Sequence, residues 1–236
     1  MTTGRIDVHS HLLPGIDDGC KTTEESIACA RVLVAEGYTH SFCTPHIWPN
    51  LPENTTPNIA THVQRLQQAL DEANVPLRLI PGGELNLRPE TMQTAPEQLV
   101  SYGSKGKFVL FDIWADELPD FFERGVRWFQ SLGAEVVLAH PERMRAVQLN
   151  PDLANYFDAL GLMLQGNLQC LADPPLTATY RVGRKFLNEG RYFLLGSDLH
   201  NLETLGHRMR GLHHAKELVG DVEVDRLTKE NPRTLL

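Results

Sequence analysis

The chain alternates short apolar runs with longer segments in which apolar residues recur at helical spacing. Runs typical of β-strands occupy residues 5–9, 39–46, 76–84, 107–113, 134–141, 161–167 and 191–198. Helical spacing predicts helices at residues 22–37, 58–74, 120–133, 151–160 and 176–190, and a largely helical segment after residue 201. Because strands that alternate with helices pair in parallel through right-handed crossovers, we expect an α/β barrel or a doubly wound sheet.

Boundary signals support this division of the chain. Thr22 and Glu25 form a capping-box pattern, Gly37 is a stop signal, and Thr56 precedes Pro57 at the start of the second helix. No Gly-x-Gly-x-x-Gly follows a strand, which disfavours a dinucleotide-binding fold. Since no linker or low-complexity tract interrupts the pattern, we expect residues 1–236 to form a single domain.

Composition and charge exclude several classes of protein. The chain has 236 residues, of which 42% are hydrophobic, so it is able to bury a sizeable core. Its net charge of −8 opposes binding to nucleic acid or to an anionic membrane surface. The first residues lack the pattern of a signal peptide, and no apolar run reaches the ~18 residues that a membrane span needs. We expect a cytoplasmic protein with no nucleic-acid partner and no membrane insertion.

The four cysteines exclude one kind of chemistry. Their irregular spacing, at Cys20, Cys29, Cys43 and Cys170, fits reduced thiols better than a disulfide framework. Cysteine-dependent phosphatases need an arginine six positions after the cysteine. The residues found at those positions are Ser26, Ala35, Pro49 and Leu176. A thiolate nucleophile in a phosphate cradle is therefore not expected.

Side chains that bind metals follow nearly every predicted strand. They are His9, His11, His46, Glu84, Asp112, His140, Asp198 and His200, with Asp18 as a ninth candidate. Singly, His46 and His140 are better explained as loop residues, and His9 with His11 as the polar face of a strand. In a parallel barrel, however, the carboxyl ends of the strands share one face, where these side chains would converge. Imidazole and carboxylate ligands without thiolate suit Mn²⁺, Fe or Zn²⁺. This number of ligands predicts two or three ions.

The motifs around these residues match a known family. "DVHSHLLPGIDDG", "TPH", "GGE", "AHPER" and "GSDLHN" occur in family order. The chain resembles the PHP (polymerase and histidinol phosphatase) superfamily, and within it the metal-dependent protein-tyrosine phosphatases of the CpsB/CapC type that are encoded with bacterial capsule and exopolysaccharide genes. The resemblance implies an α/β fold, a distorted seven-stranded TIM-like barrel that holds three metal ions.

The resemblance also implies a role for each site residue. One ion would be bound by His9, His11, Glu84 and Asp198, a second by Glu84, Asp112 and His140, and a third by Asp18, His46 and His200. Arg143 would hold the phosphate, with a surface salt bridge to Glu142 as its alternative. The expected catalytic residues are Arg143, His46, Asp198 and Arg208.

Two positions depart from the family pattern. Asp112 stands where the family usually has Glu, so its side chain is one methylene shorter. Leu205 stands where the family has an arginine, and His207 or Arg208 could replace that arginine. We favour Arg208, which would share the phosphate with Arg143.

The charge of the expected site suits a phosphate ester. Three divalent ions with the carboxylates of Asp18, Glu84, Asp112 and Asp198 would leave a charge of about +2 facing the substrate. A water shared by two ions would attack phosphorus as hydroxide. Tyrosine phosphate has an easy leaving group, because the phenol pKa is ~10.

The expected function is that of a manganese-type protein-tyrosine phosphatase acting on a phosphotyrosine protein, the tail of a bacterial tyrosine kinase of capsule synthesis. One alternative is a small-molecule phosphatase of the histidinol-phosphate type, and another is a degenerate PHP module that binds a partner without turnover. An open pocket would favour a protein substrate and a lidded one a small molecule, with the loops at residues 47–57 and 85–106 deciding between them. Amidohydrolysis is disfavoured because no lysine follows a strand to form a carbamylated bridge.

Overall fold

The strands form two parallel sheets in the computed structural model, which describes residues 4–236. A three-stranded sheet has the order β1-β2-β4 and a six-stranded sheet the order β3-β5-β6-β7-β8-β9. The strands are β1 (Arg5–Asp7), β2 (Tyr38–Cys43), β3 (His46–Ile47), β4 (Arg78–Pro81), β5 (Glu84–Asn86), β6 (Phe108–Asp112), β7 (Glu135–Ala139), β8 (Met163–Asn167) and β9 (Tyr192–Gly196).

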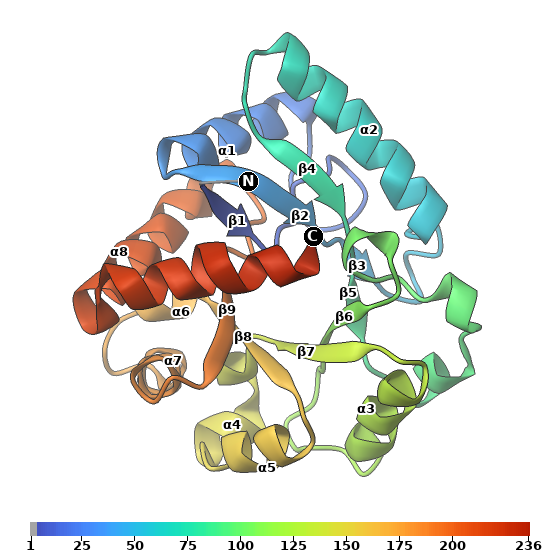
Figure 1. Ribbon diagram of the computed structural model, residues 1–236, viewed down its shortest axis with the longest axis vertical. Coiled ribbons are helices and arrows are strands. Elements are labelled where there is room, and N and C mark those ends of the chain that lie inside the picture. Colours follow the sequence, from blue (N-terminus) through green and yellow to red (C-terminus); the bar gives the residue numbers. More distant parts are fainter. Residues whose placement is uncertain (1–3) are drawn as a thin grey trace.

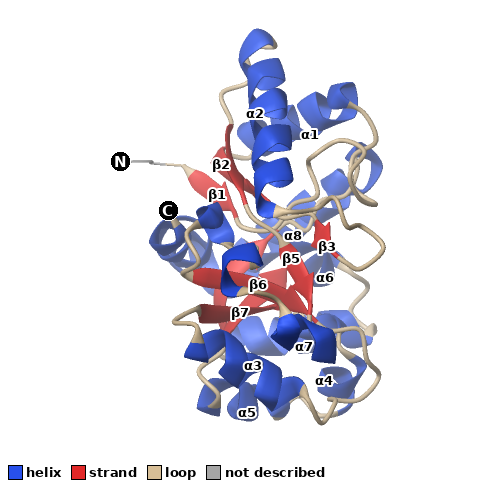
Figure 2. Cartoon of the chain, turned by 90° about the vertical axis from the view of Figure 1, so that its right-hand side faces the viewer, coloured by secondary structure: helices blue, strands red, loops and turns tan. Residues whose placement is uncertain are grey.

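Helices surround the strands, as Figure 1 shows. The α-helices are α1 (Thr23–Ala35), α2 (Thr56–Glu72), α3 (Phe122–Ser131), α4 (Arg145–Leu149), α5 (Leu153–Ala159), α6 (Leu168–Ala172), α7 (Ala178–Asn188) and α8 (Leu202–Asp225). Shorter turns are η1 (Pro89–Gln93), η2 (Pro96–Gln98), η3 (Tyr102–Ser104), η4 (Pro141–Arg143), η5 (Arg226–Glu230) and η6 (Asn231–Leu235). In Figure 2, α1 and α2 lie beside the three-stranded sheet, and α3, α4 and α5 lie at the opposite end of the molecule. The alternating α/β pattern with parallel strands is therefore confirmed.

The expected count of seven strands is not found, because two predicted strands are each divided. The run 39–46 becomes β2 and β3, and the run 76–84 becomes β4 and β5. Pro45 has no backbone N–H to continue the first ladder. At the second break the chain passes so close to its neighbours that a Cβ on Gly83 would lie 2.6 Å from Val100 Cγ1. Both breaks occur where the chain leaves the three-stranded sheet for the six-stranded one.

The two sheets also meet at the ends of β1 and β9. Beyond these strands, Ser10 and Leu199 form a parallel bridge. The backbone N–H of His11 donates to the Leu199 carbonyl (2.8 Å), and that of Asp198 donates to the His9 carbonyl (2.7 Å). The segments that follow the first and last strands are thereby joined side by side.

The tail of the chain covers the opposite ends of the same two strands. Arg5, at the start of β1, forms an ion pair with Asp225 (2.9 Å). The Arg226 guanidinium donates to the carbonyl of Tyr192, which begins β9 (3.5 Å). The carboxyl ends of the strands therefore remain free to form a site.

The interior is apolar and the cysteines belong to it. Strand side chains such as Ile6, Val109 and Leu194 have no exposed surface. The cysteines are free and buried, as expected for reduced thiols: Cys20, Cys29, Cys43 and Cys170. Thr22 Oγ1 accepts a hydrogen bond from the Glu25 backbone N–H (3.2 Å), which confirms the predicted start of α1. Among residues 4–236, no helix is both long enough and apolar enough to cross a bilayer.

Candidate active site and metal centre

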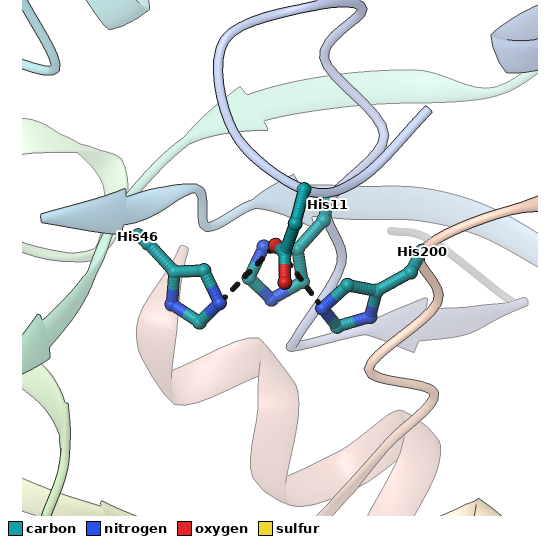
Figure 3. A group of neighbouring side chains, drawn as sticks. His11, His46 and His200 are labelled. Carbon is teal, nitrogen blue, oxygen red and sulfur yellow. Dashed lines mark ion pairs between the residues drawn. The ribbon is translucent and has the colours of Figure 1, made fainter. Parts of the chain in front are cut away.

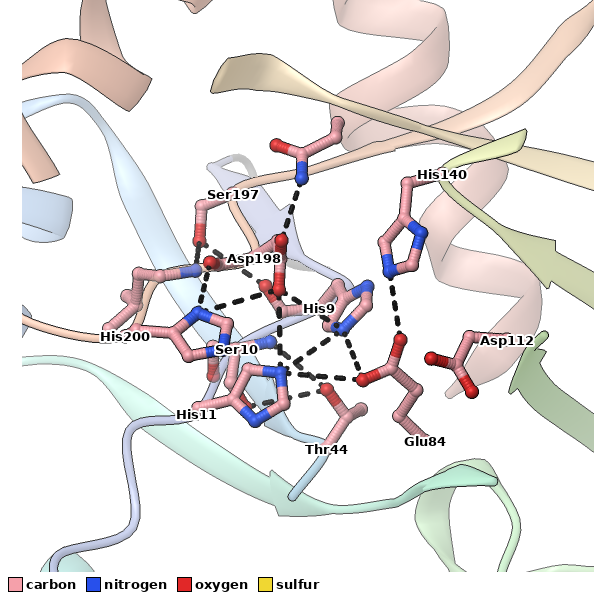
Figure 4. A network of polar contacts seen from close by, with 12 residues as sticks. His9, Ser10, His11, Thr44, Glu84, Asp112, His140, Ser197, Asp198 and His200 are labelled. Atoms are coloured by element: carbon pink, nitrogen blue, oxygen red, sulfur yellow. Dashed lines mark hydrogen bonds and ion pairs between the residues drawn. The ribbon is translucent and has the colours of Figure 1, made fainter. Parts of the chain in front are cut away.

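The carboxyl ends of the strands bring the predicted ligands together, although these residues lie far apart in the sequence. His9 and His11 follow β1, His140 follows β7, and Asp198 and His200 follow β9 (Figure 4). His46 and Glu84 begin β3 and β5 and are paired in register, because the sheet crosses over at the two strand breaks. Eight of the nine predicted ligands fall into three groups that could each hold an ion: His11, Asp18, His46 and His200; His9, His11 and Glu84; His9, His140 and Asp198.

Glu84 is fully buried and contacts imidazoles of all three groups. Its Oε1 is 2.9 Å from His140 Nε2. Its Oε2 is 2.9 Å from His46 Nδ1, 3.3 Å from His9 Nε2 and 3.6 Å from His11 Nε2. A single carboxylate therefore contacts four imidazoles, and it would be available to hold a cation together with them.

The outermost group contains His11, His46 and His200, whose rings gather around one point in Figure 3. Asp18 joins them from the loop after β1. Its Oδ1 is 3.3 Å from His46 Nε2 and 3.5 Å from His200 Nε2. The side chain of Asp18 is 57% exposed, so this group opens toward solvent.

Three of the imidazoles are held in a fixed orientation by acceptors behind them. His9 Nδ1 lies 2.8 Å from Gln165 Oε1, and His11 Nδ1 lies 2.8 Å from Asp17 Oδ2. His200 Nδ1 lies 2.8 Å from the Asp198 carbonyl. Since these partners only accept, each Nδ1 carries the proton and each Nε2 offers its lone pair to the centre of the site.

Two polar atoms in the centre lack hydrogen bonds of their own. His46 Nδ1 and Glu84 Oε2 are 2.9 Å apart and buried, but their geometry is not that of a hydrogen bond. Buried polar atoms are normally satisfied, so two such atoms side by side indicate a missing partner. With imidazole and carboxylate donors and no thiolate, the residues present fit hard or borderline divalent cations.

Asp112 is the predicted ligand that falls outside the three groups. It ends β6 and lies near Glu84 in Figure 4, but no ion pair joins it to the others. Its Oδ1 accepts a hydrogen bond from Asn86 Nδ2 (3.0 Å), and its Oδ2 accepts one from Trp114 Nε1. The shorter side chain at this position leaves the carboxylate bound by neighbours instead of by the central imidazoles.

Arg143 points into the site rather than to its neighbour in sequence. Its Nη1 donates to Asp198 Oδ2 (2.9 Å), and 44% of its side chain remains exposed. Glu142 is buried and accepts hydrogen bonds from the Asn167 backbone N–H (2.6 Å) and the Tyr192 hydroxyl (2.9 Å). The alternative of a surface salt bridge between Glu142 and Arg143 is therefore wrong.

Arg208 turns inward from α8 and reaches the same aspartate. Its Nη1 donates to the Ser197 carbonyl (2.8 Å) and lies 3.5 Å from Asp198 Oδ2. Leu205 is buried in the core, and His207 pairs with Asp173 (3.2 Å). Of the two residues that could replace the family arginine, Arg208 is the one that contacts the site, and its contact with phosphate stays a prediction.

Two residues of the site have a strained backbone conformation. Within residues 4–236, four non-glycine residues have positive φ, and two of them are His140 (32°) and Asp198 (50°). This conformation is costly for residues with a Cβ and persists where the surrounding structure imposes it. Asp198 is held by Arg143 and by Asn167 Nδ2, which donates to Asp198 Oδ2 (2.7 Å).

The charges of the site shift several pKa values. Burial alone would raise the pKa of the Glu84 and Asp198 carboxyls, but His9 holds both well below their usual range. Burial alone would lower the pKa of His46, yet Asp18 and Glu84 raise it to about 9. Burial, with repulsion from Glu84, raises the pKa of Asp112 to about 7. Protons therefore compete with cations for these ligands.

Removing metal is expected to make the stability of the protein fall as pH rises. Asp112 and His46 bind protons more tightly in the folded chain than at their usual pKa values of 3.8 and 6.5. That stabilisation is complete below the usual values and is lost as pH rises through about 7 for Asp112 and about 9 for His46. Bound cations displace these protons, so the gain in Tm on adding Mn²⁺ should widen between about pH 6 and about pH 9. Thermal unfolding with and without Mn²⁺ measures this gap, and a gap that is constant with pH would contradict it.

A pocket of about 370 Å³ adjoins the ligand groups. Its lining residues come from two segments. One is residues 112–116, at and after the end of β6, and the other, at and after the end of β7, contributes Ala139, His140, Arg143, Met144 and Arg145. Its charged lining residues are two arginines, Arg143 and Arg145, and two aspartates, Asp112 and Asp116. Arg143, next to His140, is therefore the residue of this pocket placed to meet an anionic ligand that approaches the ligand groups from solvent.

The sequence missed the residues that position these ligands. Gln165 and Asn167 lie on β8, the predicted strand after which no candidate was named, and Asp17 lies in the loop after β1. Asn167 ends β8, and Gln165 lies two residues earlier, paired with Ala139 at the end of β7. Polar side chains in an otherwise apolar strand end were therefore the available signal.

Comparisons with known proteins agree with this geometry. The family described as "Capsular polysaccharide synthesis, CpsB/CapC" matches residues 5–236. Tyrosine-protein phosphatase YwqE of Bacillus subtilis is 29% identical over 236 residues, covering 98% of this chain and 91% of that protein. Tyrosine-protein phosphatase CpsB of Streptococcus pneumoniae is 23% identical over 238 residues, covering 98% of each.

A solved structure extends the agreement to the fold. It comes from work on YwqE from Bacillus subtilis and CpsB from Streptococcus pneumoniae, described as unique metal-dependent tyrosine phosphatases. The comparison of this chain with that structure has a TM-score of 0.89 and a sequence identity of 28%. The match covers 98% of this chain and 94% of the other. With a family match that begins at β1 and runs to the end of the chain, this protein belongs to the CpsB/CapC family of capsular polysaccharide synthesis.

Proposed function

We propose that this chain is a metal-dependent protein-tyrosine phosphatase that acts on a phosphorylated tyrosine kinase of capsule or exopolysaccharide synthesis. The observation that carries the proposal is the set of three imidazoles, His9, His11 and His200, each with Nδ1 held by an acceptor and Nε2 left for a metal. Arg143 lies beside them at the mouth of a pocket, where a phosphate would meet it. The relatives named as tyrosine-protein phosphatases support the same activity.

Divalent cations bound to these ligands would acidify a water and neutralise charge on the phosphoryl oxygens. We propose two or three ions, with Mn²⁺ as the metal. Arg143 contributes a planar guanidinium that donates to phosphate oxygens, and its bond to Asp198 fixes its direction. Asp198 is in turn held by Asn167 and Arg208, so these two residues position the arginine that binds the substrate.

The proposal also assigns the whole chain to one activity. Residues 1–236 would act as one cytoplasmic catalytic domain. In a distorted barrel of seven strands, β2 with β3 would count as one strand and β4 with β5 as another, each interrupted where the chain bends.

The tyrosine leaving group needs little assistance, because a phenol with a pKa of ~10 departs without a strong general acid.

A protein substrate is favoured over histidinol phosphate because the pocket is open. Trp114 at its edge is 67% exposed, and the Arg143 side chain is 44% exposed. Both groups are accessible to a tyrosine side chain that projects from another protein. A pocket specialised for a small molecule usually buries most of its ligand.

A comparison of substrates tests the proposal. The Mn²⁺-loaded protein should hydrolyse a phosphotyrosine peptide with kcat/KM at least about tenfold above that for histidinol phosphate. A phosphoserine peptide of the same sequence serves as the control for peptide binding. A preference for histidinol phosphate would favour the small-molecule alternative, and metal-loaded protein that hydrolyses none of the three would favour a binding module.

A further inference from the structure

Trp114 is an exposed aromatic residue that no role described so far explains. It is 67% exposed and lies on the loop after β6. It lines the pocket that also contains His140 and Arg143. Single exposed hydrophobic side chains are common on proteins, so exposure alone would carry little weight. The contacts that hold Trp114 in place are what distinguish it.

The indole of Trp114 is fixed in two ways although it is mostly in solvent. Its Nε1 donates a hydrogen bond to Asp112 Oδ2. Its ring meets the ring of Trp48 edge to face, with centroids 5.7 Å apart and an interplanar angle of 83°. Trp48 is itself stacked on His46, with centroids 3.9 Å apart and an angle of 20°.

An exposed side chain that is already held in one orientation is preorganised for binding a ligand. Ordering a free side chain at an interface costs free energy, and a ring that is held in advance avoids that cost. Both contacts join Trp114 to the site, because Asp112 is a predicted ligand and Trp48 is stacked on the ligand His46. The remaining surface of the indole is available to a ligand in the pocket.

The pocket has the composition and size for an aromatic ring next to a phosphate. Its volume is about 370 Å³. Ile113, Met144 and Trp114 give it apolar surface, Arg143 and Arg145 give it positive charge, and the aspartates Asp112 and Asp116 also line it. A phosphate held by Arg143 would place the group attached to its ester oxygen among these apolar side chains.

We propose that Trp114 forms the wall of a subsite for the phenyl ring of the substrate and so selects aryl over alkyl phosphates. The inference rests on the proposed phosphatase function and names the residue that would contact the leaving group and select it. Aromatic rings attract one another in stacked or edge-to-face contacts beyond simple area burial. A phosphoserine side chain has no ring and therefore makes no such aromatic contact with Trp114.

Trp114 could instead act only through its hydrogen bond to Asp112, and the two roles predict different results. Trp114→Phe keeps an aromatic wall and removes the N–H donor. Trp114→Ala removes both. A role in substrate selection therefore predicts that the phenylalanine variant stays close to the wild type, whereas a role through Asp112 predicts that both variants fail together.

The experiment measures kcat/KM of the Mn²⁺-loaded full chain for a phosphotyrosine peptide, phenyl phosphate and the matching phosphoserine peptide. Trp114→Ala should lower the values for both aryl esters about tenfold and change that for the serine ester less than about twofold. Trp114→Phe should stay within about threefold of the wild type on all three. Leu149→Ala, which removes a side chain that is 69% exposed on α4, is the control for a surface truncation.

Binding of phosphonates gives a second readout that needs no turnover. Calorimetry on the Mn²⁺-loaded wild type should show phenylphosphonate binding about tenfold more tightly than methylphosphonate, and Trp114→Ala should remove the preference. Equal losses on aryl and serine esters, or an unchanged phenyl preference in Trp114→Ala, would overturn the inference. A wild type that hydrolyses no ester but keeps a Trp114-dependent phenyl preference would overturn the phosphatase proposal alone.

Discussion

Replacing Glu84 by Gln is expected to lower kcat/KM for a phosphotyrosine peptide by at least about a thousandfold, equivalent to ~4 kcal/mol of transition-state stabilisation. Glu84 contacts the imidazoles of His9, His11, His46 and His140, which is more imidazoles than any other carboxylate described contacts. Glutamine keeps the shape but has one neutral oxygen and an NH₂ group that cannot bind a cation. The number of ions bound per chain should fall together with activity.

The control must show that the loss arises in the site and not from unfolding. Glu97→Gln makes the same change at an exposed position, and it should leave both metal content and activity unchanged. Circular dichroism should show that the Glu84 variant keeps the wild-type fold, since glutamine can still hydrogen-bond to an imidazole. A folded Glu84→Gln protein with full metal content and wild-type turnover would contradict the role assigned to this carboxylate.

Replacing Arg143 by Ala is expected to cost ten- to a hundredfold in kcat/KM, or ~1.5–3 kcal/mol, because one charge-assisted contact to phosphate is lost. The side chain is partly exposed, so the fold should tolerate its removal. Arg145→Ala is the matched control, since it removes a second guanidinium from the same pocket without touching Asp198. An effect of Arg145→Ala equal to that of Arg143→Ala would indicate general attraction of anions instead of a specific phosphate contact.

Arg208 provides a separate comparison, because it is 6% exposed and lies behind Asp198. If it shares the phosphate with Arg143, both single variants should raise KM and the double variant should lose more than either. If it only holds Asp198 in place, Arg208→Ala should lower kcat and Tm, and adding it to Arg143→Ala should cost less than the sum of the two. Kinetics of the two single variants and the double variant distinguish these cases.

The ligands were predictable from sequence because their positions follow a geometric rule. Polar residues placed directly after apolar strands must converge when those strands are parallel, whatever their distance along the chain. Because His9 and His11 occupy alternate positions, their side chains are expected on the same face of an extended chain. Their Nε2 atoms lie 3.3 Å apart. The rule needed only the order of the elements, which the hydrophobic pattern supplied.

The residues that position the ligands did not follow from that rule. Gln165 and Asn167 carry amides, which occur throughout proteins without a metal nearby, so residue type alone did not mark them. The positive φ of His140 and Asp198 is imposed by contacts across the site and has no local sequence signal. The division of two strands depends on close approach at Gly83 and on the missing N–H of Pro45, which a strand pattern does not register.

Metal titration of the chelator-treated protein tests the central claim most directly. Phosphate release from a phosphotyrosine peptide and metal bound per chain would be measured together as Mn²⁺ is added. We predict negligible activity in the metal-free protein and activity that rises only as the second ion and any third ion bind, since His9, His11, Glu84 and their neighbours form more than one ligand group. Full activity in protein that retains no metal, or saturation with Mn²⁺ without any phosphate release, would contradict a metal-dependent tyrosine phosphatase.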